Sequence, residues 1–196
     1  MAIDEYEVPE NPYQTDFTKI ENEFQWQDYL QRYFEWNDWN VVREVRPAGT
    51  EYRADLLVEH DEYGWFGIET KWANLGGRVM AEAHHQIVKK YRRRTYFGHK
   101  IDLWVYAPFY EFYRKDKSQD FVERKYLIDL TQGFFQRHGI GFLRGGTAKG
   151  AGFWEMQFEL SSADHFVGIE RASDREPDMD AIRETVKWRT QQYSYR

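Results

Sequence analysis

The chain has 196 residues and a formal net charge of −6, and 41% of its residues are apolar, including eight Trp, 14 Tyr and 14 Phe. This length and aromatic content predict one folded domain and exclude a disordered chain. The absence of Cys excludes disulfide scaffolds, thiolate zinc sites, iron–sulfur clusters and cysteine nucleophiles. Because the sequence has neither a long apolar run nor a signal-peptide pattern at its start, we expect a cytoplasmic protein without membrane association.

Charge is distributed unevenly along the chain. Residues 1–40 hold two basic and ten acidic residues, whereas residues 41–160 hold 19 basic and 16 acidic residues. The overall negative charge argues against a nucleic-acid partner, since phosphate binding depends on a basic surface. The middle segment nevertheless contains the run Lys89-Lys90-Tyr91-Arg92-Arg93-Arg94. This run is interpreted either as a solvated helix face or as a surface for phosphate groups.

The predicted elements begin after a polar, irregular arm at residues 1–17. Thr18 and Glu21 have the spacing of a capping box, which predicts a helix from there to about Trp36. At 100° per residue, Glu23 falls inside the apolar stripe of this helix and Glu21 lies beyond its edge, so Glu23 is expected to point inward. The stripe consists of Phe17, Ile20, Phe24, Leu30 and Phe34.

Strands and helices then alternate along the rest of the chain. Strands are expected at residues 41–46, 52–59 and 65–72, followed by a helix at 78–94 and a buried strand at 101–107 that Pro108 stops. The remaining predicted elements are a helix at 119–138 closed by Gly139, strands at 140–144 and 153–160 joined by a glycine-rich link at 145–152, and a helix at 178–192. This order predicts an α/β fold with a central mixed sheet of about five strands flanked by helices.

Two of the predicted strands place charged residues opposite one another. A hairpin symmetric about Glu62 pairs Asp55 with Glu69 and Arg53 with Lys71, and strand parity puts all four on one face. Opposed carboxylates repel each other unless a cation lies between them. Such oxygen ligands suit Mg²⁺, and Lys71 could orient or deprotonate an attacking water. The alternative interpretation is an exposed ladder of cross-strand salt bridges.

An Asp on one strand, Glu-x-Lys on the next and an inward Glu on the preceding helix resemble the PD-(D/E)XK nuclease superfamily, which has the restriction endonuclease-like fold. The matching residues are Asp55, Glu69-Thr70-Lys71 and Glu23. The resemblance covers residues 18–108. It implies a single nuclease-like domain at 18–196, in which 18–108 form the catalytic core and 109–196 form a C-terminal extension. In pattern the chain is most similar to Holliday-junction resolvases and to small restriction-type or viral endonucleases.

The chain departs from the superfamily's motifs at two places. Ala54 stands where the motif's name has Pro, a position that varies. Gln86 and Tyr91 are five residues apart, whereas the exonuclease-type signature needs four. The second departure argues against the recombination-exonuclease subfamily.

The resemblance implies a Mg²⁺-dependent nuclease that hydrolyses phosphodiester bonds of DNA, as an endonuclease, with Mn²⁺ able to substitute. The implied metal ligands are Asp55, Glu69, Glu23 and the backbone carbonyl of Thr70, and Lys71 completes the catalytic set. Contacts to DNA are expected from Arg53, Gln86, Lys90, Arg92, Arg93, Arg94 and Lys149. The alternative is a catalytically silent module that binds nucleic acid or protein on the same fold. The form of the DNA substrate and a homodimeric state remain open.

Overall fold

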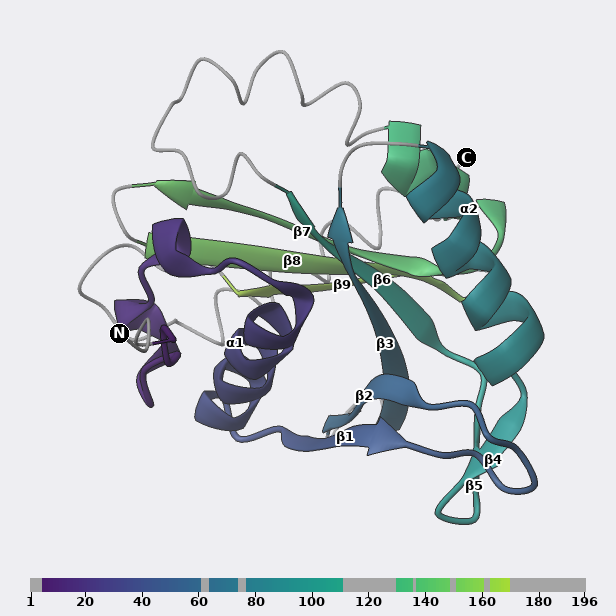
Figure 1. Cartoon of the computed structure of the whole chain (residues 1–196). Helices are drawn as coiled ribbons and strands as arrows, with labels where there is room; N and C mark the ends of the chain where they lie inside the picture. The colour runs from purple at the N-terminus through teal and green to yellow at the C-terminus, as the bar shows by residue number, and fades with distance from the viewer. Residues whose placement is uncertain are drawn as a thin grey trace.

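A mixed β-sheet of seven strands forms the centre of the protein in the computed structural model (Figure 1). The structure describes residues 5–60, 64–73, 77–110, 130–135, 137–148, 151–160 and 163–169. The strand order is β1-β2-β3-β6-β7-β8-β9, and β6 pairs in parallel with β3 and with β7 while the other pairs are antiparallel. The strands are β1 (Asn40–Val45), β2 (Ala54–His60), β3 (Gly64–Ala73), β6 (Trp104–Tyr110), β7 (Gly141–Ala148), β8 (Ala151–Leu160) and β9 (Ala163–Ile169). The predicted α/β class and mixed sheet are confirmed, but the sheet has more strands than the expected five. The strand expected at 153–160 is present as β8, whereas β9 was not predicted.

Helices cover both faces of this sheet. Helix α1 (Glu23–Trp36) packs on one face, and α2 (Gly77–His85) continues as the π-helical segment η3 (Gln86–Tyr91) on the other (Figure 1). Side-chain alternation explains the division, because Trp26 of α1 contacts Phe109 whereas Tyr91 of η3 stacks on Trp104. Phe109 and Trp104 differ by an odd number of residues and therefore lie on opposite faces of β6.

Helix α1 begins later than its sequence suggests. The predicted capping box at Thr18 is wrong, because Phe17–Lys19 forms a short 3₁₀ turn (η2) that Asp16 caps. A similar turn, η1 (Pro12–Gln14), precedes it in the N-terminal arm. The cap of α1 is Asn22, whose side-chain oxygen accepts the N–H of Gln25 at 2.9 Å. Glu23 is therefore the first residue of the helix.

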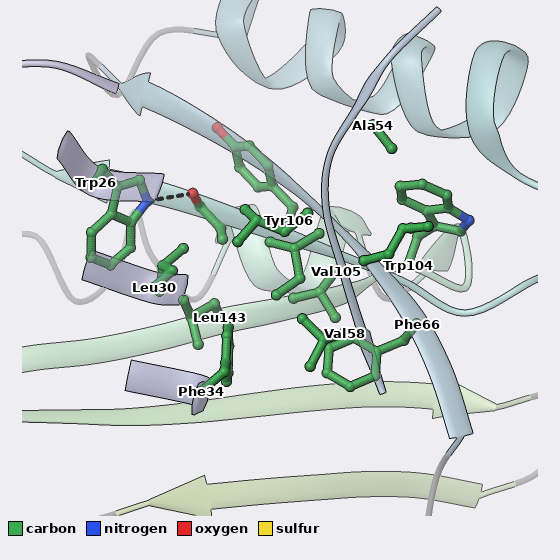
Figure 2. Close-up of a cluster of buried hydrophobic side chains, with 14 of the residues drawn as sticks. Trp26, Leu30, Phe34, Ala54, Val58, Phe66, Trp104, Val105, Tyr106 and Leu143 are labelled. Atoms are coloured by element: carbon green, nitrogen blue, oxygen red, sulfur yellow. Dashed lines mark hydrogen bonds between the residues drawn. The ribbon is translucent and has the colours of Figure 1, made fainter. Parts of the chain in front are cut away.

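The core between α1 and the sheet is aromatic and aliphatic. Figure 2 shows Trp26, Leu30 and Phe34 of α1 beside Val58, Val105 and Leu143 of the sheet, with the indole N–H of Trp26 donating to the Ala107 carbonyl at 3.0 Å. The predicted position of Phe24 in this stripe is wrong, since its side chain is 62% exposed. The Arg43 guanidinium lies over the Phe24 ring, 4.5 Å from its centroid.

Two predicted ends of elements are also wrong. The strand that Pro108 was expected to stop continues to Tyr110 as β6, where Pro108 pairs with Lys71. This Pro is tolerated because β7 pairs with β6 only at Val105 and Tyr106, so no ladder bond on that side needs an N–H from residue 108. Likewise the helix expected to run to Arg94 ends at Tyr91.

A two-stranded hairpin follows η3 instead of the expected helical end. It consists of β4 (Arg94–Tyr96) and β5 (His99–Ile101), and it forms a separate small sheet that projects at one end of the molecule (Figure 1). Arg92 leaves the helical conformation with a ψ of 140°, and Arg93, with a φ of 65°, turns the chain toward β4.

The C-terminal half is described in part. Residues 130–135 are helical and Gly139 has a φ of 65°, in agreement with the predicted helix end. The expected glycine-rich link at 145–152 is wrong over its described residues, because Gly145–Ala148 and Ala151–Gly152 pair as the ends of β7 and β8. Lys149 and the predicted helix at 178–192 lie outside the described residues. Within the described part of the chain, no helix is long and apolar enough to cross a membrane.

Candidate metal and catalytic site

The site predicted from the sequence lies where β2 and β3 separate. The ladder between these strands runs from His60 opposite Gly64 to Leu56 opposite Ile68, which confirms the predicted register over those pairs. Asp55 and Glu69 are the next residues along the two strands, and beyond this point β3 continues beside β6. One edge of β3 therefore needs partners other than β2 for its backbone groups.

Two carboxylates supply those partners. The Thr70 N–H donates to Asp55 Oδ2 at 2.7 Å, and the Trp72 N–H donates to Glu23 Oε2 at 2.9 Å. We call this place, formed by Asp55, Thr70, Trp72 and Glu23, the fork. Because the N–H and C=O of one strand residue point to the same side, the Thr70 carbonyl also faces the fork. The fork thus joins α1, β2 and β3.

Glu69 and Lys71 lie beside the fork on the face of β3 that α2 and η3 cover. Their side chains are 1% and 14% exposed, and Lys71 Nζ donates to Glu69 Oε1 at 2.7 Å. The second oxygen, Glu69 Oε2, is buried and has no hydrogen-bond partner among the residues that the structure describes. A buried carboxylate with only one oxygen satisfied is costly, so this oxygen is available to a cation.

Burial and crowding raise the pKa of the carboxylic acids at the site. Burial, and then the charge of Asp55, raises the pKa of Glu69 to about 8 despite the opposing effect of Lys71. Burial is also the main cause of the raised pKa of Asp55 and of Glu23. For Lys71, burial lowers the pKa, but Glu69, then Glu23 and Asp55, raise it by more. The ammonium group therefore stays protonated at neutral pH.

A directed chain of hydrogen bonds reaches Asp55 from the protein surface. Arg43 Nη2 donates to Gln27 Oε1 at 3.0 Å, Gln27 Nε2 donates to Thr70 Oγ1 at 2.8 Å, and Thr70 Oγ1 donates to Asp55 Oδ2 at 2.8 Å. Arg43 also forms an ion pair with Asp28. Since a guanidinium only donates and a carboxylate only accepts, the direction of every bond in this chain is fixed. Gln27, which the sequence analysis missed, thus holds the Thr70 hydroxyl toward Asp55.

The donor set fits a hard divalent cation held by two carboxylates. Glu69 and Asp55 each keep an oxygen beyond the hydrogen bonds described, and Mg²⁺ needs only one or two protein carboxylates because water and phosphate oxygens complete its shell. Among the described residues, no group of three or more His, Asp or Glu side chains is placed to hold a metal ion together. Glu23 therefore contributes through its contact with Trp72 rather than as a third ligand in this arrangement.

The residues expected to contact DNA do not form one helix face. Arg92 donates to the carbonyls of His138, at 2.9 Å, and Gly139, so its guanidinium is committed to the fold. Arg94 Nε donates to the Lys90 carbonyl at 3.0 Å, and Arg93 is exposed. The interpretation of the run as one continuous helical surface is wrong, because the helix ends before Arg92.

The other expected DNA contacts that the structure describes are Arg53, Gln86 and Lys90. Lys90 Nζ lies over the Tyr52 ring, 5.2 Å from its centroid, and exposed Arg53 is 3.5 Å from Glu44. The Oε1 atom of Gln86 is buried and has no hydrogen-bond partner among the described residues. Lys90 and Arg53 are thus the members of this group that stand near solvent.

No family model matches the chain, and neither a curated protein nor a solved structure matches it. The resemblance to the PD-(D/E)XK superfamily accordingly rests on four residues and their placement. Those residues come from three elements, α1, β2 and β3, and they interact electrostatically with one another. Convergence of this kind gives the basis for a functional proposal.

Proposed function

We propose that the protein is a Mg²⁺-dependent DNA endonuclease with a restriction endonuclease-like fold. The observation that carries this proposal is the meeting of Glu23, Asp55, Glu69 and Lys71 around the open edge of β3. Glu69 Oε2 is buried and lacks a hydrogen-bond partner within the described part of the chain. This supports a cation there more strongly than a salt-bridge ladder, since a ladder exposed to water would leave no buried acceptor.

Each side chain has a distinct task in this proposal. Glu69 and Asp55, with the Thr70 carbonyl, hold the cation, which supplies Lewis-acid stabilisation of the charge that develops on the phosphate. Lys71, kept protonated by its acidic neighbours, orients the attacking water or a phosphate oxygen as a donor rather than accepting a proton. Glu23 fixes the position of Trp72 and so of the strand that carries Glu69 and Lys71.

Incubation with DNA tests the proposal directly. The protein is mixed with supercoiled, linear, single-stranded and four-way-junction DNA, with Mg²⁺, with Mn²⁺ and with excess chelator. We expect cleavage only with a divalent cation, and loss of cleavage in Glu69→Ala. The matched control is Glu59→Ala, which removes a half-buried carboxylate on β2 that contacts Asn40 away from the fork. Undiminished cleavage by Glu69→Ala, or full activity in chelator, would refute the proposal.

Binding without cleavage is the other outcome of the same experiment. If the wild-type protein shifts DNA in a gel but leaves every substrate intact with Mg²⁺ and with Mn²⁺, a catalytically silent binding module is the correct description. The retention of both carboxylates and of Lys71 argues against that description, because binding alone requires none of them.

A further inference from the structure

The tip of the β4–β5 hairpin presents an aromatic side chain to solvent. Phe97 is 62% exposed and forms a two-residue turn with Gly98 between the paired residues Tyr96 and His99. Its ring makes a tilted contact with Trp65, with 6.1 Å between the ring centroids. The indole of Trp65 therefore supports the Phe97 ring from one side and leaves most of it open.

The backbone at this tip is unfavourable for phenylalanine. Phe97 and Gly98 have φ angles of 48° and 79°, the left-handed conformation that a tight hairpin turn requires. Gly, Asn and Asp are the residues that adopt it readily, whereas a bulky side chain there is strained. The chain thus carries an exposed aromatic ring at a position where stability favours Asn, and strain of this kind points to a function for the side chain.

The segment that leads into the hairpin and forms its tip is basic. From Arg92 to Lys100 the chain has four permanent cations and no Asp or Glu. Arg93 and Lys100 are exposed, and His99 is exposed beside the aromatic tip. Exposed cations in the same short segment as an exposed aromatic ring match the two chemical parts of a nucleic-acid strand, the phosphates and the base faces.

Strand geometry relates this tip to the candidate site. Trp65 and Glu69 lie on the same face of β3 and are four residues apart, which corresponds to roughly 13 Å along an extended strand. That length equals about four nucleotides of a B-form strand. A strand whose phosphate reaches Glu69 can therefore bring a base a few nucleotides away to Phe97.

We infer that Phe97 stacks on an unpaired base, so that the β4–β5 hairpin selects DNA with an unpaired base near the cleavage position over fully paired duplex. This inference rests on the proposed function for its substrate, DNA. In a fully paired duplex the base faces are covered by their neighbours, and the ring could reach them only by unstacking a step. An overhang, gap or branch offers a free base face without that cost.

Fluorescence of 2-aminopurine tests the inference without cleavage. The Glu69→Gln protein in chelator is titrated into DNA that carries one unpaired 2-aminopurine at a gap, and separately into a closed, fully paired dumbbell of equal length. We expect quenching of the unpaired probe with Phe97 or Phe97→Trp, and loss of quenching with Phe97→Leu. The Kd for the gapped DNA should rise by about fivefold to a hundredfold in Phe97→Leu, as for loss of one stacked base. The Kd for the dumbbell should change less than twofold.

Two further variants separate base stacking from folding. Phe97→Asn suits the left-handed backbone, so it should melt at an equal or higher temperature than the parent while losing the quenching. Trp36→Leu removes another half-exposed aromatic, at the far end of α1, and should leave both quenching and Kd unchanged. Equal losses on gapped DNA and dumbbell, or full quenching by Phe97→Leu, would overturn the inference. Absence of cleavage by the wild-type protein would refute the proposed function. The quenching and Kd results would still decide the inference about Phe97, because they are measured without cleavage.

Discussion

The Asp55 carboxylate accepts hydrogen bonds from both the backbone N–H and the side-chain hydroxyl of Thr70, at 2.7 and 2.8 Å. One oxygen of Asp55 thereby takes the place that a neighbouring strand would fill in an unbroken sheet. The other oxygen takes part in neither of these bonds. Asp55 consequently has a structural and a chemical task, and a substitution has to separate them.

Asp55→Asn and Asp55→Ala should differ in stability but not in activity. The Asn carboxamide oxygen can still accept from Thr70, whereas Ala leaves a part-buried N–H without its partner, at a cost of about 1 to 3 kcal/mol. Both changes remove the negative charge, so cleavage should fall by about 100-fold or more in each. Urea unfolding and a plasmid-nicking assay measure the two effects. An active Asp55→Asn protein would show that the charge is not needed.

Glu23→Ala should reduce activity by about tenfold, and Glu21→Ala should have no effect. Glu23 accepts the Trp72 N–H and so positions the strand beside Glu69, while Glu21 is exposed. A positioning contact of this kind is typically worth 10- to 100-fold. Initial cleavage rates at saturating Mg²⁺ decide the matter, and equal rates for the two variants would remove Glu23 from the site.

The metal-free protein should lose stability as the pH rises from about 4.5 to about 8. The pKa of Glu69 is about 8 in the folded protein, above its value of 4.5 in a free chain, so folding favours the protonated acid. That contribution is complete below pH 4.5 and is lost as Glu69 ionises, by an amount on the order of a few kcal/mol. The raised pKa of Asp55 and of Glu23 adds to the same trend. The raised pKa of Lys71 gives a stabilising contribution that is constant below the free-chain value of 10.5 and is lost only as the pH rises above it, outside this range.

Melting temperatures in excess chelator between pH 5 and pH 9 test this dependence. Glu69→Gln, which cannot ionise, should flatten the curve, and the control Glu59→Gln should keep the wild-type slope. A wild-type curve as flat as that of Glu69→Gln would mean that Glu69 is already ionised throughout the range.

The position of the site could be predicted because it depends on strand periodicity. The alternation of side chains and the pairing of His60 with Gly64 fix which residues of β2 and β3 oppose one another, and these rules are local. The inward direction of Glu23 was predicted correctly for a partly wrong reason. The N-cap of α1 is Asn22 and not Thr18, so Glu23 is the first residue of the helix. Glu23 reaches β3 from this end position and does not belong to a long apolar stripe.

Features that depend on contacts between distant segments could not be predicted in this way. Gln27 lies one helical turn after Glu23, which signals a shared face, but only the packing of α1 on β3 shows that it contacts Thr70. The β4–β5 hairpin has strands of three residues, too short for an alternating pattern. The basic run therefore favoured a longer helix, and the role of Arg92 at the carbonyls of His138 and Gly139 stayed hidden.

Gln27→Leu should lower activity by about tenfold and Gln27→Glu should lower it further. Leucine removes the donor to Thr70, leaving its hydroxyl free to rotate away from Asp55. Glutamate adds a negative charge near Asp55 and keeps the acceptor for Arg43, so a loss greater than in Gln27→Leu identifies the effect as electrostatic. The loss of activity is measured as the ratio of kcat to KM with metal in excess, and the apparent Mg²⁺ affinity is measured alongside. Unchanged Mg²⁺ affinity and rate in both variants would make Gln27 a packing residue only.

The salt dependence of DNA binding should identify Arg93 and Lys100, and not Arg92, as phosphate contacts. Both are exposed on or beside the β4–β5 hairpin, whereas the guanidinium of Arg92 is held by two carbonyls. Each lost phosphate contact lowers the slope of log affinity against log salt by about 0.9 on duplex DNA, so the double variant Arg93→Asn, Lys100→Gln should flatten it by about two units.

Asn is chosen at position 93 because the backbone there has a φ of 65°, which Asn tolerates. The weakening should be similar for DNA of any sequence, since phosphate contacts do not read bases. Arg92→Ala should instead lower the melting temperature and leave the slope as it is, because it removes hydrogen bonds that hold η3 to residues 138 and 139. If the double variant keeps its affinity and slope while Arg92→Ala loses them at full stability, the DNA path follows Arg92, and the hairpin lies away from it.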